Sequence, residues 1–172
     1  MHDANWLRKS VGIERMRILV LGLGNELLAD DAVGLLAARE LRAPLDGQAD
    51  VVESSLSGVA LIELLLGYDC AILIDAVQTG DYPPGTIREF TPADLDSVIA
   101  PSPHYAGIPE LIALASQLDL DFPDEIRIYA MEIADACSIG GALTDPVRAA
   151  LGKLVDRVKQ DVCASQKELC HA

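Results

Sequence analysis

Three interior residues of this 172-residue chain have side chains and surroundings suited to acid–base or metal chemistry: Asp31, Asp75 and His104. Asp31 lies shortly after an apolar run that ends in glycine, and Asp75 directly follows another apolar run. His104 is the only histidine away from the chain ends. One imidazole and two carboxylates suit a borderline divalent metal with open coordination positions, and are too few for a closed structural site.

Each of these residues also has a purely structural interpretation. Asp31, or Asp30 before it, is placed to cap the helix expected to follow, and Asp75 is placed to form a turn. His104 is placed to cap a helix that begins near Pro109. The positions are more informative together, because open α/β sheets carry their sites beyond the carboxyl ends of the strands.

The junction Gly22-Leu23-Gly24 invites a dinucleotide-binding interpretation, which remains an alternative. The third glycine of that fingerprint is absent, since Leu27 stands in its place. Asp30 and Asp31 would also repel a pyrophosphate at the start of the helix. The sequence contains neither a GxSxG nucleophile elbow nor an HExxH zinc motif.

Alternating strand and helix patterns must position these residues. Continuous apolar runs predict strands at 17–22 and at 70–74, the latter ending at Asp75. Further strands are predicted at 49–53, at 86–90, where the residues alternate, and at 125–131. Helical spacing predicts helices after Asp31, at 56–67, from about 109 and from about 144. This order predicts a three-layer α/β/α sandwich around a mostly parallel five-stranded sheet, with 86–90 as a candidate antiparallel edge strand. We expect one domain at 16–163, an N-terminal extension at 1–15 and a frayed tail at 164–172.

The amino-acid composition and net charge argue against some classes of function. The chain is 51% hydrophobic and carries a net charge of −14, which is typical of a globular protein and argues against a nucleic-acid partner. No apolar run is long enough to span a bilayer and the first residues lack a secretory signal, so we expect a cytoplasmic protein without a membrane partner. The four cysteines form no CxxC pair, and Cys70 is expected to be a small core residue.

Three motifs together resemble those of the hydrogenase maturation endopeptidases. Gly22–Gly34 (GLGNELLADDAVG) is similar to the family's GxGNxLxxD[DE]xxG pattern. The strand that leads into Asp75 is followed by a Pro/Gly-rich turn, and Ser102–Glu110 (SPHYAGIPE) is similar to the family's third motif around its histidine. The resemblance runs from about residue 16 to 154.

The resemblance implies an endopeptidase that removes the C-terminal extension of a nickel-iron hydrogenase large-subunit precursor after nickel insertion. It places metal binding and catalysis at Asp31, Asp75 and His104, where Asp31 is one methylene shorter than the Glu that the family often has. Nickel would arrive on the substrate, and other divalent metals would suit the same ligands. A monomer is expected. A non-catalytic nickel-binding chaperone of hydrogenase assembly and a small nucleotide-binding protein stay open as alternatives.

Overall fold

The computed structural model describes residues 16–97, 104 and 107–169, in which strands and helices follow in the expected order. The strands are β1 (Ile18–Leu23), β2 (Asp50–Ser54), β3 (Cys70–Val77), β4 (Ile87–Phe90) and β5 (Glu125–Glu132). The α-helices are α2 (Val33–Arg42), α3 (Ile62–Leu65), α4 (Ile108–Gln117) and α5 (Asp145–Leu169). Three short 3-10 helices complete them: η1 (Asp30–Ala32), η2 (Gly58–Leu61) and η3 (Pro92–Ser97). The predicted extension at 1–15 lies outside the described residues.

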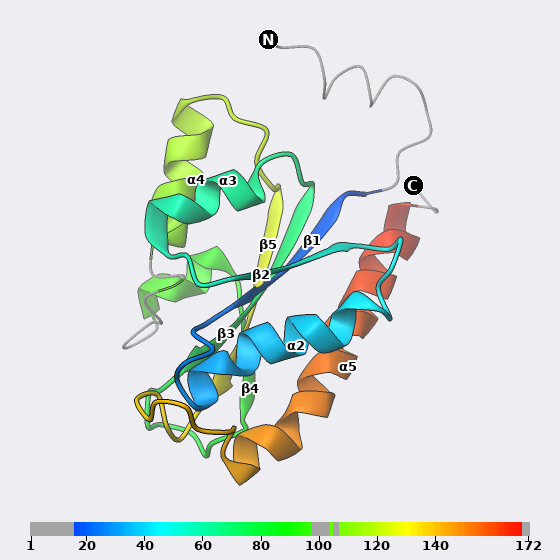
Figure 1. Cartoon of the computed structure of the whole chain (residues 1–172). Helices are drawn as coiled ribbons and strands as arrows, with labels where there is room; N and C mark the ends of the chain where they lie inside the picture. Colours follow the sequence, from blue (N-terminus) through cyan, green and yellow to red (C-terminus); the bar gives the residue numbers. More distant parts are fainter. Residues whose placement is uncertain (1–15, 98–103, 105–106, 170–172) are drawn as a thin grey trace.

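The sheet has the strand order β2-β1-β3-β5-β4, with β4 antiparallel to β5 and every other pair parallel. Helices α2 and α5 cover one face, and α3 and α4 cover the other (Figure 1). The predicted three-layer α/β/α class and its antiparallel edge strand are confirmed. The parallel strands all end at one edge of the sheet, which we call the carboxyl edge.

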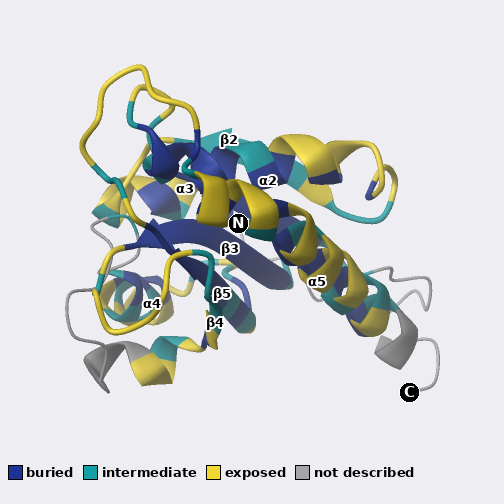
Figure 2. Cartoon of the chain, turned by 90° about the horizontal axis from the view of Figure 1, so that it is seen from below, coloured by how far each residue is buried: buried dark blue, intermediate teal, exposed yellow. Residues whose placement is uncertain are grey.

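The core consists of two apolar layers, one on each face of the sheet. Residues of β1 alternate between them, with Ile18 and Val20 packed toward α2 and α5, and Leu19 and Leu21 toward α3 and α4. All residues of β1 and β3 are buried, as expected for central parallel strands, and Figure 2 shows β3 buried between helices with exposed outer faces. Burial of each such Leu or Ile stabilises the fold by about 1.5–3 kcal/mol.

Tertiary contacts move several predicted boundaries. Strand β3 does not end at Asp75, because pairing with β5 continues to Val77. The helix predicted at 56–67 is reduced to η2 and the single turn of α3, which ends where Gly67 takes a φ of +85°. The helical spacing after Pro109 also predicts that Leu118 points inward, yet Leu118 is 58% exposed.

The tail predicted to begin at residue 164 is instead the end of α5. The helix continues to Leu169, and Ser165 is buried. Gln166 Nε2 donates to the carbonyl oxygens of Met16 and Gln48, both at 3.0 Å. These bonds tie α5 to the residues that precede β1 and β2, a contact that the polar sequence of the segment does not reveal. Residues 170–172 of the predicted tail lie outside the described residues. Within the described residues, no helix combines the length and apolar character needed to cross a bilayer.

Candidate active site at the carboxyl edge of the sheet

Asp31 lies in η1, on the loop that leads from β1 into α2. The loop folds back on the strand, because a Cβ at Gly24 would meet the Asp31 carbonyl oxygen, and Gly24 has a φ of +145° that glycine tolerates. The η1 turn lies against β3. The Asp31 side chain is half-buried, and its carboxylate has no hydrogen-bond or ion-pair partner among the described residues.

Asp30 has a different task from its neighbour. It is fully buried and accepts hydrogen bonds from Ala134 N, Asp135 N and both the amide and hydroxyl of Thr144, at 2.6–3.1 Å. The predicted helix cap is therefore wrong for both aspartates, since no side chain caps η1 or α2. Asp30 instead joins the loop after β1 to the loop between β5 and α5.

Asp75 lies inside β3 and is fully buried. It alternates in step with Ala71, Leu73 and Val77, which pack toward α3 and α4, so its side chain points to that face. The Asp75 Oδ1 atom accepts a hydrogen bond from Ala76 N at 2.8 Å, and the side chain has further interactions. The sequence predicted that Asp75 lies at the end of the buried strand. In the structure, β3 continues for two residues beyond Asp75, and these residues are buried and paired with β5.

His104 precedes α4 and lies against the segment that follows β2. Its Nδ1 is 3.1 Å from the Leu56 carbonyl oxygen, and Gly107 packs beside Gly58. Since a carbonyl only accepts hydrogen bonds, Nδ1 carries the proton in this contact, and a neutral ring has its lone pair at Nε2. This tautomer is the one in which Nε2 is suited to bind a metal.

Packing brings the segments of the three residues to the same edge of the sheet. A Cβ at Gly34 would meet the carbonyl oxygens of Leu23 and Ile74, so the first turn of α2 sits directly on the ends of β1 and β3. Asp31 precedes that turn, and Asp75 follows Ile74. In the described part of the chain, no three His, Cys, Asp or Glu side chains are already gathered as a metal site.

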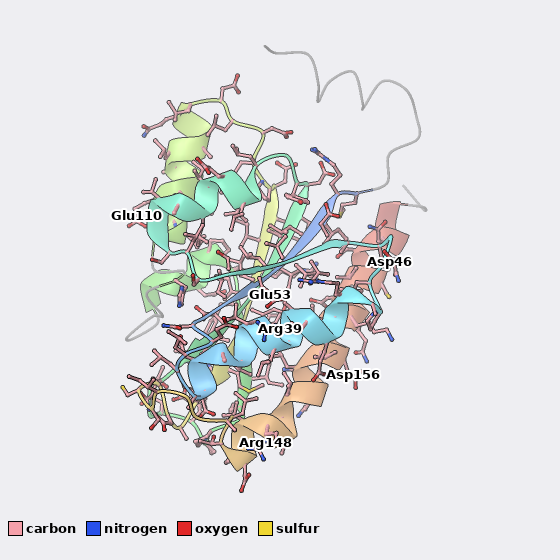
Figure 3. All side chains as sticks on the ribbon, viewed as in Figure 1. Arg39, Asp46, Glu53, Glu110, Arg148 and Asp156 are labelled. Atoms are coloured by element: carbon pink, nitrogen blue, oxygen red, sulfur yellow. The ribbon has the colours of Figure 1, made fainter. Side chains whose placement is uncertain are left out.

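A groove of about 380 Å³ lies beside this edge. Its lining comes from the loop after β1, from α2 and from the end of β2: Asn25, Glu26, Leu27, Leu35, Arg39, Glu53, Ser54 and Ser55. Arg39 joins the two walls through ion pairs with Glu26 at 3.0 Å and Glu53 at 2.6 Å, and Figure 3 shows Arg39 and Glu53 close together. The hydrogen bonds that Arg39 donates to Glu26 and Glu53 raise the pKa of Arg39, so the groove keeps this positive charge.

Glu132, at the end of β5, is a second buried carboxylate with a structural task. Its Oε1 accepts from the amides of Thr79 and Gly80, and its Oε2 from the Thr79 hydroxyl, all at 2.8 Å. It thereby holds the turn that follows β3. The sequence predicted only a minor structural role for Glu132, which closes an apolar strand. It missed the role of Asp30, for which the available signal was an acid next to a candidate site residue.

A mostly parallel sheet with carboxylates and an imidazole near its carboxyl edge is typical of an α/β enzyme. A sequence model of the HycI hydrogenase maturation protease family matches residues 35–161, which include Asp75 and His104 and begin just after Asp31. The chain belongs to the hydrogenase maturation protease family.

Individual relatives agree with this assignment. The chain is 30% identical to the hydrogenase 2 maturation protease of Escherichia coli K12 over 149 residues, or 83% of this chain and 88% of that protein. It is 31% identical to the hydrogenase expression/formation protein HupM of Azotobacter chroococcum mcd 1 over 78% of this chain. The chain spans 66% of HupM and 61% of the HupD protein of Thiocapsa roseopersicina, both of which are longer.

A solved structure supports the fold. The hydrogenase maturating endopeptidase HybD from E. coli superposes with a TM-score of 0.72 at 24% identity, over 87% of this chain and 94% of that chain. At this identity the superposition supports the architecture rather than the chemistry. The predicted family and the α/β/α fold are thus confirmed by separate comparisons of sequence and of structure.

Proposed function

We propose that this protein is an endopeptidase that removes the C-terminal extension of a nickel-iron hydrogenase large-subunit precursor once nickel has been inserted. The observation that carries the proposal is the packing of three segments near the carboxyl edge: the turn with Asp31 lies on the ends of β1 and β3, Asp75 follows Ile74 in β3, and His104 contacts the segment after β2. Family membership supports the peptidase reaction and the hydrogenase substrate. In this proposal nickel is part of the substrate and identifies a precursor that is ready to be cut.

The donor set suits that recognition. Two carboxylates and an imidazole bind borderline divalent metals such as nickel, and other divalent metals would compete for the same ligands. The contact from His104 Nδ1 to Leu56 leaves Nε2 as the ligand nitrogen. The protein would then bind the nickel-loaded precursor more tightly than the nickel-free precursor. This difference in affinity makes cleavage depend on nickel.

Between the two aspartates, Asp31 is better suited to act as general base. Its half-buried carboxylate has no hydrogen-bond partner among the described residues, so it can accept a proton from a water molecule at the edge. Asp75 is fully buried and already accepts a hydrogen bond from Ala76. We therefore assign Asp75 and His104 to metal recognition, and Asp31 to metal recognition and proton transfer.

The test uses purified precursor with and without nickel, and follows the C-terminal mass loss by mass spectrometry. We expect cleavage only of the nickel-loaded precursor, and a loss of at least about 100-fold in rate for Asp31→Asn, Asp75→Asn and His104→Ala. Asp156→Asn is the matched control, because this acid is exposed on α5 away from the edge (Figure 3).

Two results would redirect the proposal. Binding of the nickel-loaded precursor without any shortening would identify a chaperone of hydrogenase assembly instead of a protease. Wild-type cleavage by Asp75→Asn or His104→Ala would show that those residues are not part of the site.

We further propose that the protein acts as a cytoplasmic monomer. A mass by light scattering of twice that of the 18.3 kDa chain would contradict the monomer.

A further inference from the structure

Two loops at the carboxyl edge are joined to each other by backbone hydrogen bonds. One follows β1 and carries Asp31, and the other connects β5 to α5; Figure 1 shows them side by side at one end of the sheet. Ala29 N donates to Ser138 O at 2.9 Å, and Gly140 N donates to Leu27 O at 2.8 Å. These two bonds form a single antiparallel bridge, between Leu28 and Ile139, outside the main sheet.

Asp30 is the buried centre of this junction. Its carboxylate oxygens accept hydrogen bonds from the amides of Ala134, Asp135 and Thr144 and from the Thr144 hydroxyl. Its own amide donates to Asp135 O at 3.0 Å. The loop between β5 and α5 therefore holds both the backbone and the side chain of Asp30.

The chemistry of the junction explains why the residue is an aspartate. Both carboxylate oxygens meet only N–H or O–H donors in these contacts, so an ionised carboxylate satisfies them all. Thr144 precedes the first residue of the 25-residue helix α5, whose N-terminal end favours a negative charge. An asparagine would turn an NH₂ group toward some of these donors and leave buried groups unpaired.

We propose that Asp30 is the positioning residue for Asp31, an inference that rests on the proposed function. Consecutive Cα atoms are about 3.8 Å apart, so fixing residue 30 fixes where the backbone of residue 31 can be. The Asp31 carboxylate takes no part in the junction and is left available for chemistry. The two adjacent acids thus have different roles: Asp30 fixes the position of the loop, and Asp31 takes part in metal recognition and proton transfer.

The first measurement is the rate of cleavage of nickel-loaded precursor by Asp30→Asn. A misplacement of about 1 Å at a reacting group costs up to about 100-fold in rate, so we expect kcat to fall by about 10–100-fold. We expect KM to rise by a smaller factor than kcat falls, because Asp75 and His104 keep their places and still recognise the substrate metal, whereas proton transfer depends on Asp31 alone. If the variant simply folded less well, the fraction of folded protein would fall, and kcat per folded molecule would stay at the wild-type value.

Milder variants keep the test valid if Asp30→Asn folds poorly. Thr144→Val removes the hydroxyl bond at 2.9 Å but keeps the backbone bond to Asp30, and we expect a loss of kcat of about 3–10-fold. Thr144→Ser keeps the hydroxyl and should retain the wild-type kcat. Tyr129→Phe is the structural control, since it removes the 2.5 Å bond from Tyr129 to Asp161 on α5 without touching either loop.

Hydrogen exchange gives a readout apart from activity. In Asp30→Asn, the amides of Ala134, Asp135 and Thr144 should exchange at least about tenfold faster, while amides of β3 keep their protection. The same amides should keep wild-type protection in Tyr129→Phe.

The outcomes separate this inference from the proposed function. Inactive Asp31→Asn together with Asp30→Asn or Thr144→Val at wild-type kcat would overturn the positioning role and leave the proposed function standing. Wild-type activity of Asp31→Asn would overturn the proposed function itself. A fall in kcat for Thr144→Val that Thr144→Ser restores, with Tyr129→Phe unchanged, supports the positioning role.

Discussion

The substitution Gly34→Ala tests how closely α2 is packed on the carboxyl edge. A Cβ at position 34 would meet the carbonyl oxygens of Leu23 and Ile74 well inside van der Waals contact, and the Ile74 carbonyl carbon at 3.1 Å. These neighbours are strand backbone, which cannot rotate away as a side chain can. The start of α2 must therefore move outward by about 1 Å to restore a separation of about 3.5 Å.

The expected cost follows from two opposing terms. Overpacking of a core costs about 1–3 kcal/mol, and the rigid backbone on both sides places Gly34→Ala near the upper end, at about 3 kcal/mol. The better helix propensity of alanine returns about 1 kcal/mol. The net loss is about 2 kcal/mol, which lowers the Tm by about 4–8 °C in a protein of this size.

Urea denaturation of Gly34→Ala and Gly152→Ala makes a matched pair. Gly152 is an exposed glycine inside α5, and a Cβ there would meet nothing within 4 Å. That substitution should raise the free energy of unfolding by about 0.5–1 kcal/mol, since it gains helix propensity at no steric cost. The reasoning fails if Gly34→Ala is as stable as the wild type, or if both variants change stability in the same direction.

Three further predictions concern two buried side chains, Glu132 and Cys70. Glu132→Gln should lower the free energy of unfolding by about 1.5–3 kcal/mol, because its charged hydrogen bonds to Thr79 and Gly80 are buried; an unchanged urea midpoint would contradict this. Burial raises the pKa of the Cys70 thiol to about 11, so iodoacetamide at pH 8 should label exposed Cys137 and spare Cys70, and equal labelling rates would refute it. Since the folded pKa is raised, the contribution of Cys70 to stability is full below about pH 8.5 and falls as the pH rises toward 11, which unfolding at pH 8 and 10.5 measures against Cys70→Ala.

Much of the fold follows from local patterns. The β1 and β3 runs are apolar at every position or nearly so, and such strands are stable only between two helical layers. The period of three and four in α2 predicts the buried face formed by Val33, Ala37 and Leu41. These patterns predicted the class of fold because burial of apolar surface dominates it. The edge strand β4 was predicted from the alternation at 86–90, and only one of its residues is buried.

The errors arise where long-range contacts outweigh local pattern. The apolar stretch at 56–67 has the pattern of a helix, yet the residues before Gly58 are not helical. The carbonyl oxygen of Leu56 instead contacts His104. The polar end of α5 reads as a tail, yet Gln166 bonds to backbone more than a hundred residues away. Neither partner is visible from within the segment itself.

The candidate site divides in the same way. By its motifs, the sequence predicted Asp31, Asp75 and His104 as the residues of the proposed chemistry, and the family comparison agrees with the resemblance that the motifs show. It did not reveal the structural role of Asp30, which has the same side chain as Asp31 and lies directly before it. Only the tertiary structure decided that Asp30 is buried among donors from a loop about a hundred residues later, whereas Asp31 remains half-exposed. The physical reason is that a carboxylate's task depends on its partners and its burial, and both are set by how distant segments pack.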